Sequence, residues 1–275
     1  MNAATVRLFH VAVYTWLALY MGALIFLGQA AWTNAPVDLF AAHDGLRGAF
    51  QTAINSLSPM TCIALTVLVM AFSIMLIRQH RWWLALITWF LFRIITHRAW
   101  LASNGGIQLM ENMLLWSALM TTPRTSDLVP TFSFWAARLQ LLLVYFATAA
   151  HKFTGTMWLD GSAVMRVALD PTFHLHWLSA FPHLCAILTF ATLAFMSLFP
   201  FAVWAPAPKR SGVGAWKTTR RAFLLIGAAF HMSTAVFMDI PQMGFAFIAC
   251  YAIWLSEDEA GWFLAWPARM RARFA

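Results

Sequence analysis

Apolar runs of membrane-spanning length recur along the chain and restrict what it can fold into. Such runs cover residues 9–32, 60–77, 132–151 and 182–204. A helix needs about 20 apolar residues to cross the hydrocarbon core of a bilayer. Of the 275 residues, 61% are hydrophobic and 10% are charged, more apolar surface than a soluble domain of this size can bury. The sequence therefore predicts an integral membrane protein.

The predicted fold is all-α, a polytopic helical bundle with about eight transmembrane helices. Within lipid, only helices and closed barrels satisfy their own backbone groups, and the alternation of period two typical of a barrel is absent. Four further runs complete the eight: 82–97, 105–121, 222–238 and 242–255. We treat residues 1–256 as one transmembrane domain and 257–275 as a basic cytoplasmic tail. The first run is too long for a cleavable signal peptide.

The distribution of basic residues predicts the orientation of this bundle. One side collects Arg7, Arg78, Arg81, Arg124, the basic loop 209–221 and the tail residues Arg269, Arg271 and Arg273. The other side carries Arg47, Arg98, Lys152 and Arg166. The positive-inside rule then places both termini in the cytoplasm, and we expect a bacterial inner membrane. Because topology explains the net charge of +8, we expect contact with membrane lipid and no nucleic acid partner.

The most informative stretch is 138–161, in which an apolar helix ends at His151 and Lys152. Tyr145 lies two turns before this end, and Trp158 follows after a short turn. A lysine at a helix end often extends its ammonium group to the membrane interface, and that is one reading of Lys152. The other reading is a functional site at the outer end of the bundle, in which Lys152 acts on a ligand.

A second group of polar residues lies on one helix face. Asn104, Gln108 and Glu111 follow the spacing i, i+4, i+7 in the predicted span 105–121. A carboxylate is costly within a membrane, so Glu111 is expected to face the protein interior. It is either part of a functional site or a hydrogen-bonded clamp between helices.

His231 is the third candidate, in the apolar span 222–238. It either orients a ligand hydroxyl or bonds a backbone carbonyl. Asn104, Glu111, Lys152 and His231 converge if their helices pack as neighbours. A lysine partly withdrawn from water loses stabilisation of its ammonium form and can act as a base, whereas an adjacent Glu111 would favour the ammonium. Both possibilities stay open from sequence.

Other motifs are missing or weak. The chain has no serine-nucleophile elbow, P-loop, dinucleotide-binding glycine pattern or HExxH sequence. His174, His176 and His183 lack the spacing of a metal site, and we expect none. Cys62 and Cys185 fall near the same predicted surface, where either a disulfide or two free thiols would fit.

Several ordered elements resemble the HTTM family, the membrane domain shared with vitamin K-dependent gamma-glutamyl carboxylase. They are Asn104-Gly105-Gly106, Arg138-Leu139-Gln140, Tyr145, Lys152 with Trp158 and Gly161, and His231 followed by Met243-Gly244-Phe245. The resemblance spans residues 5–256. It implies a lyase-type chemistry that uses vitamin K hydroquinone or another quinol, with Lys152 as the base that deprotonates it. Glu111 and His231 complete the expected catalytic group, and Asn104, Gln108, Tyr145, His151 and Trp158 are expected to hold the quinol.

The chain also departs from this family. The carboxylase has a histidine where this chain has Gly105, and many bacterial members have an acid where this chain has Ile107. It also lacks the large lumenal domain that presents glutamates, so we expect a site for a quinol-like or lipid ligand rather than protein carboxylation by this chain alone. A second hypothesis is a membrane partner in the maturation or export of a secreted, toxin-like peptide, together with a small partner protein. A third is a lipid or quinone carrier without chemistry.

Overall fold

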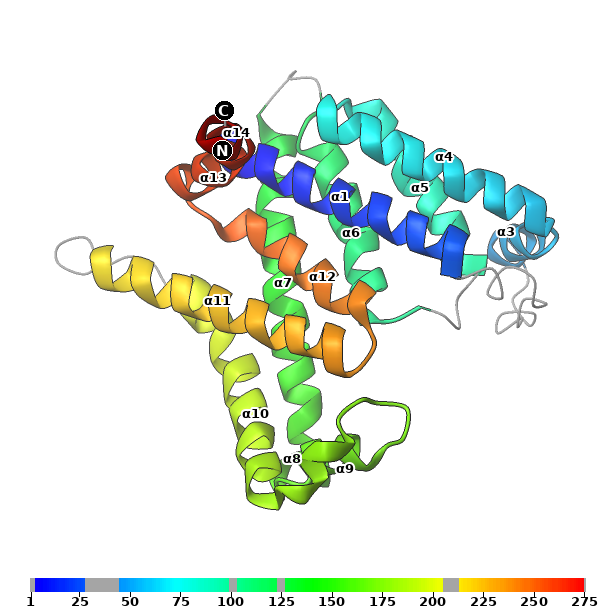
Figure 1. Cartoon of the computed structure of the whole chain (residues 1–275). Coiled ribbons are helices and arrows are strands. Elements are labelled where there is room, and N and C mark those ends of the chain that lie inside the picture. The colour runs from blue at the N-terminus through cyan, green and yellow to red at the C-terminus, as the bar shows by residue number, and fades with distance from the viewer. Residues whose placement is uncertain (1–2, 28–44, 99–102, 123–126, 205–212, 275) are drawn as a thin grey trace. The chain divides into compact units, whose positions relative to one another are not determined.

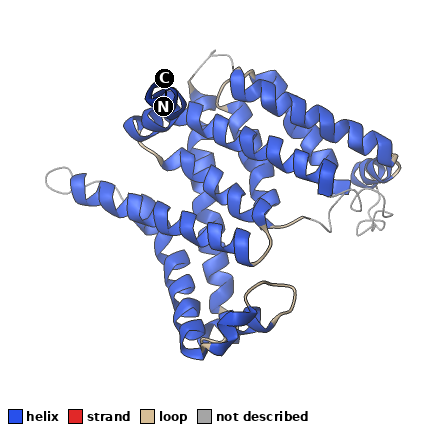
Figure 2. Ribbon diagram, in the orientation of Figure 1, coloured by secondary structure: helices blue, strands red, loops and turns tan. Residues whose placement is uncertain are grey.

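The described part of the chain is helical throughout. The computed structural model describes residues 3–27, 45–98, 103–122, 127–204 and 213–274. Within these ranges every regular element is a helix and none is a strand (Figure 2). The all-α fold class is therefore confirmed.

Four helices are long and apolar enough to cross a membrane. They are α1 (Ala3–Leu27), α4 (Pro59–Arg78), α7 (Leu128–Phe153) and α10 (Pro182–Trp204). Many of their large apolar side chains are exposed, among them Ile187, Phe190 and Phe201 of α10. Exposed apolar faces on helices of this length fit contact with lipid, which supports a membrane protein.

The other four predicted spans are also helices. They correspond to α5 (Trp82–Arg98), α6 (Gly105–Leu119), α11 (Val213–Phe237) and α12 (Pro241–Cys250), which continues into the 3-10 helix η3 (Tyr251–Trp254). α6 and α12 have only 15 and 10 residues, shorter than a single crossing needs. The structure thus supports four spans, and a count of eight remains a prediction.

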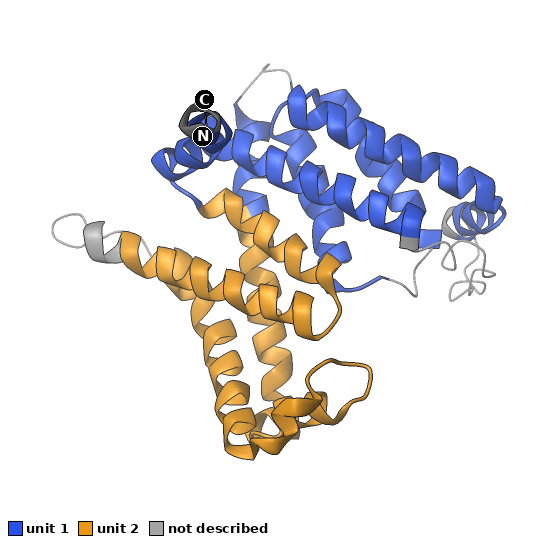
Figure 3. Cartoon of the chain, in the orientation of Figure 1, with its two compact units in different colours: residues 1–137, 255–275 blue, residues 138–254 orange. Residues whose placement is uncertain are grey.

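The chain divides into two compact units (Figure 3). Unit 1 comprises residues 1–137 and 255–275, and unit 2 comprises residues 138–254. The boundary falls within α7, whose first residues belong to unit 1. The segment 257–275, treated above as a tail, contains α13 (Glu257–Leu264) and α14 (Trp266–Phe274). α13 packs against α1, so this segment is part of unit 1.

Unit 1 is built around α1 and α4, which pack side by side (Figure 1). Phe9, Val13, Leu17 and Met21 of α1 are fully buried, at the helical spacing of one apolar face. α5 packs on α4 and α6, and the short helix α3 (Leu46–Asn55) packs on α5. These contacts place the polar residues of α5 and α6 opposite one another.

Arg7 joins the beginning of α1 to the end of α4. Its guanidinium donates to the carbonyl oxygens of Ile77 at 2.6 Å and Arg78 at 3.0 Å. The last carbonyls of a helix have no partner within the helix, so this side chain satisfies two of them. α4 also begins with a cap, because the Ser58 hydroxyl accepts from the backbone N–H of Thr61 at 3.1 Å.

Unit 2 packs α11 closely on α12. A Cβ atom at Gly244 of α12 would overlap the carbonyl oxygen of His231 and lie 2.9 Å from the Cβ of Ala235. Glycine thus permits a backbone approach that no other residue would allow. The short helices α8 (Thr156–Leu159), α9 (Ala163–Leu169) and η2 (His176–Ala180) follow α7 and lead into α10.

Candidate functional site

The end of α7 places Lys152 beside the next turn of chain. The helix ends where the Thr154 hydroxyl donates to the His151 carbonyl at 2.7 Å and the Gly155 N–H donates to the Lys152 carbonyl at 3.1 Å. α8 starts directly afterwards at Thr156, and it carries Trp158. The turn brings Trp158 back toward the end of α7.

The Lys152 ammonium lies on the face of the Trp158 indole. Its Nζ atom is 3.4 Å from the ring centroid, a cation–π contact. Gly155 leaves room for this ring, because a Cβ atom there would lie in tight contact, 3.3 Å from Cδ1 of Trp158. Within the described residues, Lys152 has neither a hydrogen bond nor a carboxylate within ion-pair distance. The contact of Lys152 with Trp158 was not predicted from sequence, and the neighbouring His151 is exposed.

Asp160 and Gly161 form a turn of defined backbone geometry after α8. Gly161 has a φ of +81°, and a Cβ atom there would lie 3.0 Å from Phe190 of α10. Asp160 Oδ1 accepts the backbone N–H of Ser162 at 2.8 Å, and hydrogen bonding from Ser162 lowers the pKa of the Asp160 carboxyl. Asp160 therefore stabilises the loop through Ser162.

A buried polar network lies in the same unit. The Tyr145 hydroxyl of α7 is 2.6 Å from Nε2 of His231 of α11, and it also bonds the hydroxyl of Tyr251 of η3. All three residues are buried. The His231 ring stacks on Phe247 with centroids 4.3 Å apart, and the Tyr145 ring stacks on Phe199 at 4.1 Å. Apolar rings thus enclose a chain of three polar groups.

The number of available protons limits which group donates each hydrogen bond in this network. Tyr145 has a single O–H, so it donates to one neighbour and accepts from the other. If it donates to His231, the His231 Nδ1 carries the remaining proton; if it accepts from His231, Nδ1 is a free acceptor. That Nδ1 atom is buried and has no hydrogen-bond partner in the part of the chain that the structure describes. The network therefore ends in one polar atom available to a ligand or water.

Tyr251 was not predicted from sequence. It lies in an apolar segment, Ala249-Cys250-Tyr251-Ala252, with no polar neighbour to mark it. Gly227 lies one turn before His231 on α11. A Cβ atom at Gly227 would overlap the Tyr251 hydroxyl, so glycine leaves the space in which that hydroxyl lies.

Tyr145 and Lys152 share a face of α7. They are seven residues apart, which is two turns and about 10 Å along the helix axis. Ala149 lies between them on the same face and is buried. The cation and the polar network therefore occupy two levels of one helix face within unit 2.

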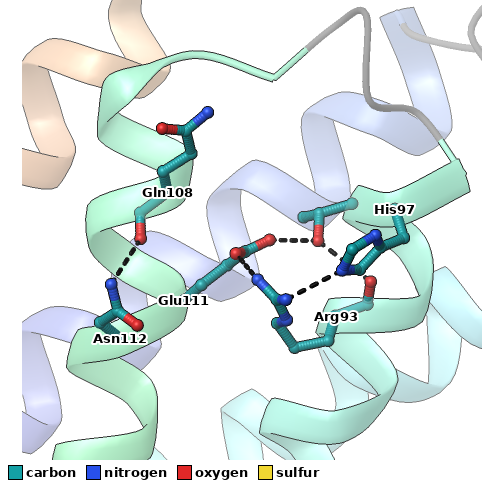
Figure 4. Close-up of polar contacts among 6 residues, drawn as sticks. Arg93, His97, Gln108, Glu111 and Asn112 are labelled. Carbon is teal, nitrogen blue, oxygen red and sulfur yellow. Dashed lines mark hydrogen bonds and ion pairs between the residues drawn. The ribbon is translucent and has the colours of Figure 1, made fainter. Parts of the chain in front are cut away.

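The remaining predicted residues lie in unit 1. Asn104 caps α6: its Oδ1 accepts from the backbone N–H groups of Gly106 at 3.0 Å and Ile107 at 3.2 Å. Gln108 is exposed, and its carbonyl accepts from Asn112 Nδ2 at 3.4 Å (Figure 4). Asn104 therefore stabilises the start of α6 as its N-cap residue.

Glu111 is buried and joins α6 to α5. Its carboxylate forms an ion pair with Arg93 and accepts a hydrogen bond from the Thr96 hydroxyl (Figure 4). Arg93 also contacts Nε2 of His97 at 2.9 Å. This arrangement matches the alternative of a clamp between helices. The convergence of Asn104 and Glu111 with Lys152 and His231 involves both units and stays a prediction.

Metal-binding and disulfide chemistry find no support in the described residues. No group of three or more histidine, cysteine, aspartate or glutamate side chains there could hold a metal ion. Cys62, Cys185 and Cys250 are free thiols, so the possible disulfide between Cys62 and Cys185 is not formed.

Comparisons with known proteins identified no relative of this chain. No protein-family model, curated protein or solved structure matches this chain.

Proposed function

We propose that the protein is an integral membrane protein that binds a quinol-type ligand in unit 2, with Lys152 as the proton acceptor. The observation that carries the proposal is the environment of Lys152. Its ammonium lies on the Trp158 ring at the end of a span, and no carboxylate of the described residues pairs with it. A salt bridge would hold the lysine in its charged form. Without one, the neutral amine that acts as a base is more accessible.

Trp158 gives this site two properties. Its indole face stabilises the ammonium by roughly 0.5–2 kcal/mol, less than a buried carboxylate would. It also provides an aromatic wall beside the nitrogen, suited to a flat aromatic ligand. Lys152 Nζ would accept a proton from a ligand hydroxyl that lies against this wall.

The Tyr145–His231–Tyr251 network supplies the second polar level of the site. Tyr145 of this network lies two turns from Lys152 on the same face of α7, and no described residue bonds Nδ1 of His231. A ligand with a polar ring and an apolar tail would meet polar atoms at these levels and aromatic side chains such as Phe199 and Phe247 between helices. This combination of few polar groups in an apolar setting is typical of sites for small amphipathic ligands.

The reaction class comes from the resemblance to the HTTM family. A bound hydroquinone would supply the electrons that reduce dioxygen in carboxylase- or epoxidase-type chemistry. The residues of this chain hold and orient the ring, and Lys152 receives the proton from its hydroxyl. His151 would contribute through its position beside Lys152.

Mass spectrometry of the purified protein tests the proposal. A quinone or quinol is expected to co-purify with the wild type and to be lost or chemically altered in Lys152→Met, which keeps the length of the side chain but not the nitrogen. Arg166→Met removes an exposed cation from the same outer segment and is the matched control. The control is expected to retain the compound.

Absence of any quinone from wild type and control alike would overturn the quinol assignment and favour a peptide-maturation role. Equal retention and equal hydroquinone oxidation in Lys152→Met would show that the lysine is only an interfacial anchor.

A further inference from the structure

Arg138 adds a third polar level to the face of α7 that carries Tyr145 and Lys152. The three residues are seven positions apart, so Arg138 lies about 21 Å from Lys152 along the helix axis. α7 is long and apolar enough to cross a membrane. An arginine inside such a helix is costly and points to a function of its own. Arg138 takes no part in the quinol site proposed above.

The Arg138 side chain is held in place by η3. Its Nε donates to the carbonyl oxygen of Ile253 at 3.1 Å, and its guanidinium lies over the Trp254 ring, 4.8 Å from the ring centroid. Trp254 is buried, and its ring packs edge-on against that of Trp204 of α10 with centroids 6.2 Å apart. These contacts orient the guanidinium through neutral groups, which do not cancel its charge.

A second guanidinium lies near the first. Arg220 is on α11, and its positive charge acts on Arg138. Both side chains are half-buried. Two like charges that are partly withdrawn from water repel each other more strongly than they would in water. An anion that contacts both groups would remove this repulsion.

The carboxylates of unit 2 lie at its other end. This unit contains three acidic residues, Asp160, Asp170 and Asp239. The first two follow the end of α7 that carries Lys152, and the third follows the last residue of α11. The next acidic residues along the chain, at 257–259, begin α13 of unit 1, where Glu259 closes a capping box with Ser256. The charged neighbours of Arg220 on α11, in contrast, are the basic Lys217 and Arg221.

The exposed face of α11 changes from polar to apolar along the helix. Its positions follow the helical spacing and are Thr218, Arg221, Leu225, Ala229, Met232 and Val236. Leu225 is 71% exposed, which fits contact with lipid rather than with water. A polar, cationic beginning followed by an apolar stripe matches the headgroup and the acyl chains of a phospholipid.

We propose that Arg138 and Arg220 bind the phosphate of an anionic phospholipid, whose acyl chains lie along the exposed face of α11. The planar guanidinium pairs with phosphate oxygens through two parallel hydrogen bonds. Basic sites between membrane helices are typical sites for anionic headgroups. The local excess of positive charge selects a headgroup of net negative charge, such as phosphatidylglycerol, and repels the choline cation of phosphatidylcholine.

Native mass spectrometry of the full chain in detergent tests the proposal. Delipidated protein is titrated with phosphatidylglycerol or with phosphatidylcholine of the same acyl chains, and bound lipid is counted from the added mass. We expect one saturable phosphatidylglycerol site with at least about tenfold preference over phosphatidylcholine. Arg220→Gln should weaken phosphatidylglycerol binding about tenfold, which corresponds to the loss of one charge-assisted hydrogen bond.

Arg166→Gln is the matched control. It makes the same change of charge in unit 2, at an exposed position beyond Lys152, and its affinity should equal that of the wild type. Equal binding of the two lipids, or equal phosphatidylglycerol affinity in Arg220→Gln and Arg166→Gln, would overturn the proposal. Displacement of the lipid by millimolar inorganic phosphate would also overturn it and assign the arginine pair to free phosphate.

A measurement on the wild type covers the case in which Arg220→Gln does not fold. The midpoint of thermal unfolding is compared in nanodiscs of phosphatidylglycerol and of phosphatidylcholine. We expect a higher midpoint in phosphatidylglycerol. Equal midpoints would contradict a site that selects anionic headgroups.

Discussion

The Tyr145 hydroxyl lies 2.6 Å from Nε2 of His231, although 86 positions separate the two residues in the sequence. The same hydroxyl bonds Tyr251, so one atom holds together α7, α11 and η3. The Tyr145 phenol therefore links three elements of unit 2 by hydrogen bonds.

Tyr145→Phe removes that atom and leaves the shape of the ring. His231 and Tyr251 then keep buried polar atoms without a partner, and we expect a loss of about 1–3 kcal/mol in the free energy of unfolding. Tyr20→Phe is the control, because the Tyr20 hydroxyl makes no hydrogen bond in the described part of the chain. Denaturant or thermal unfolding in detergent measures both. Equal stability of the two variants would show that the network contributes nothing.

Gly244→Ala should destabilise unit 2 because the new methyl group meets backbone. The carbonyl oxygen of His231 cannot move without displacing α11, and overpacking of this kind costs about 1–3 kcal/mol. Gly261→Ala in α13 meets nothing within 4 Å and should be neutral or stabilising, since alanine favours helix. A shift in the unfolding midpoint distinguishes them. A stable Gly244→Ala would contradict the close packing of α11 and α12.

The Arg93–Glu111 pair is expected to behave as a structural clamp. Arg93→Met leaves a buried carboxylate with Thr96 as its remaining partner and should cost about 3 kcal/mol. Arg93→Met combined with Glu111→Leu removes both charges and should be less destabilised than the single variant. A double-mutant cycle on unfolding free energies measures the coupling. Additive losses would mean that the two side chains do not interact.

His80 predicts how the stability of unit 1 depends on pH. Its pKa is lowered by burial and by Arg7 from the ordinary value of 6.5 to about 4, so the unfolded chain binds a proton that the folded chain does not between these values. Stability from this residue is complete above about pH 6.5 and falls by at most about 3 kcal/mol as the pH approaches 4.

The measurement is the unfolding midpoint between pH 4 and pH 7.5. His80→Asn, whose amide can still bond Thr121, should flatten the slope. His176→Asn, at an exposed position, is the control. A slope that persists in His80→Asn would assign the acid sensitivity to other groups.

Sequence patterns predicted the positions of the helices better than the side-chain contacts between them. All eight predicted apolar runs are helices over their described residues, because hydrophobic length is a local property; residues 28–32 of the first run lie outside that part of the chain. The burial of Glu111 was also expected, since a carboxylate in an apolar helix has to face protein. Its partner was not, because Arg93 lies in a run rich in Trp and Phe and pairs only once α5 and α6 pack.

In the candidate site too, contacts between residues close in sequence are easier to foresee than contacts between distant helices. Lys152 and Trp158 are close in sequence, and a short turn is enough to bring them together. Tyr251 and the His10–His80 stack depend on contacts between distant helices, for which the sequence holds no local signal. Asn104 illustrates the opposite case, because its position before two glycines is a helix cap that local rules describe fully.

The contact between Arg7 and the end of α4 has a consequence for synthesis of the protein. α1 is synthesised before α4, and the acceptor carbonyl at Ile77 is 70 positions later in the chain than Arg7. At about 5–20 residues per second, several seconds pass between the synthesis of the guanidinium and that of its acceptors. The synthesis of α4 is therefore the event that allows this contact to fix α1 in place.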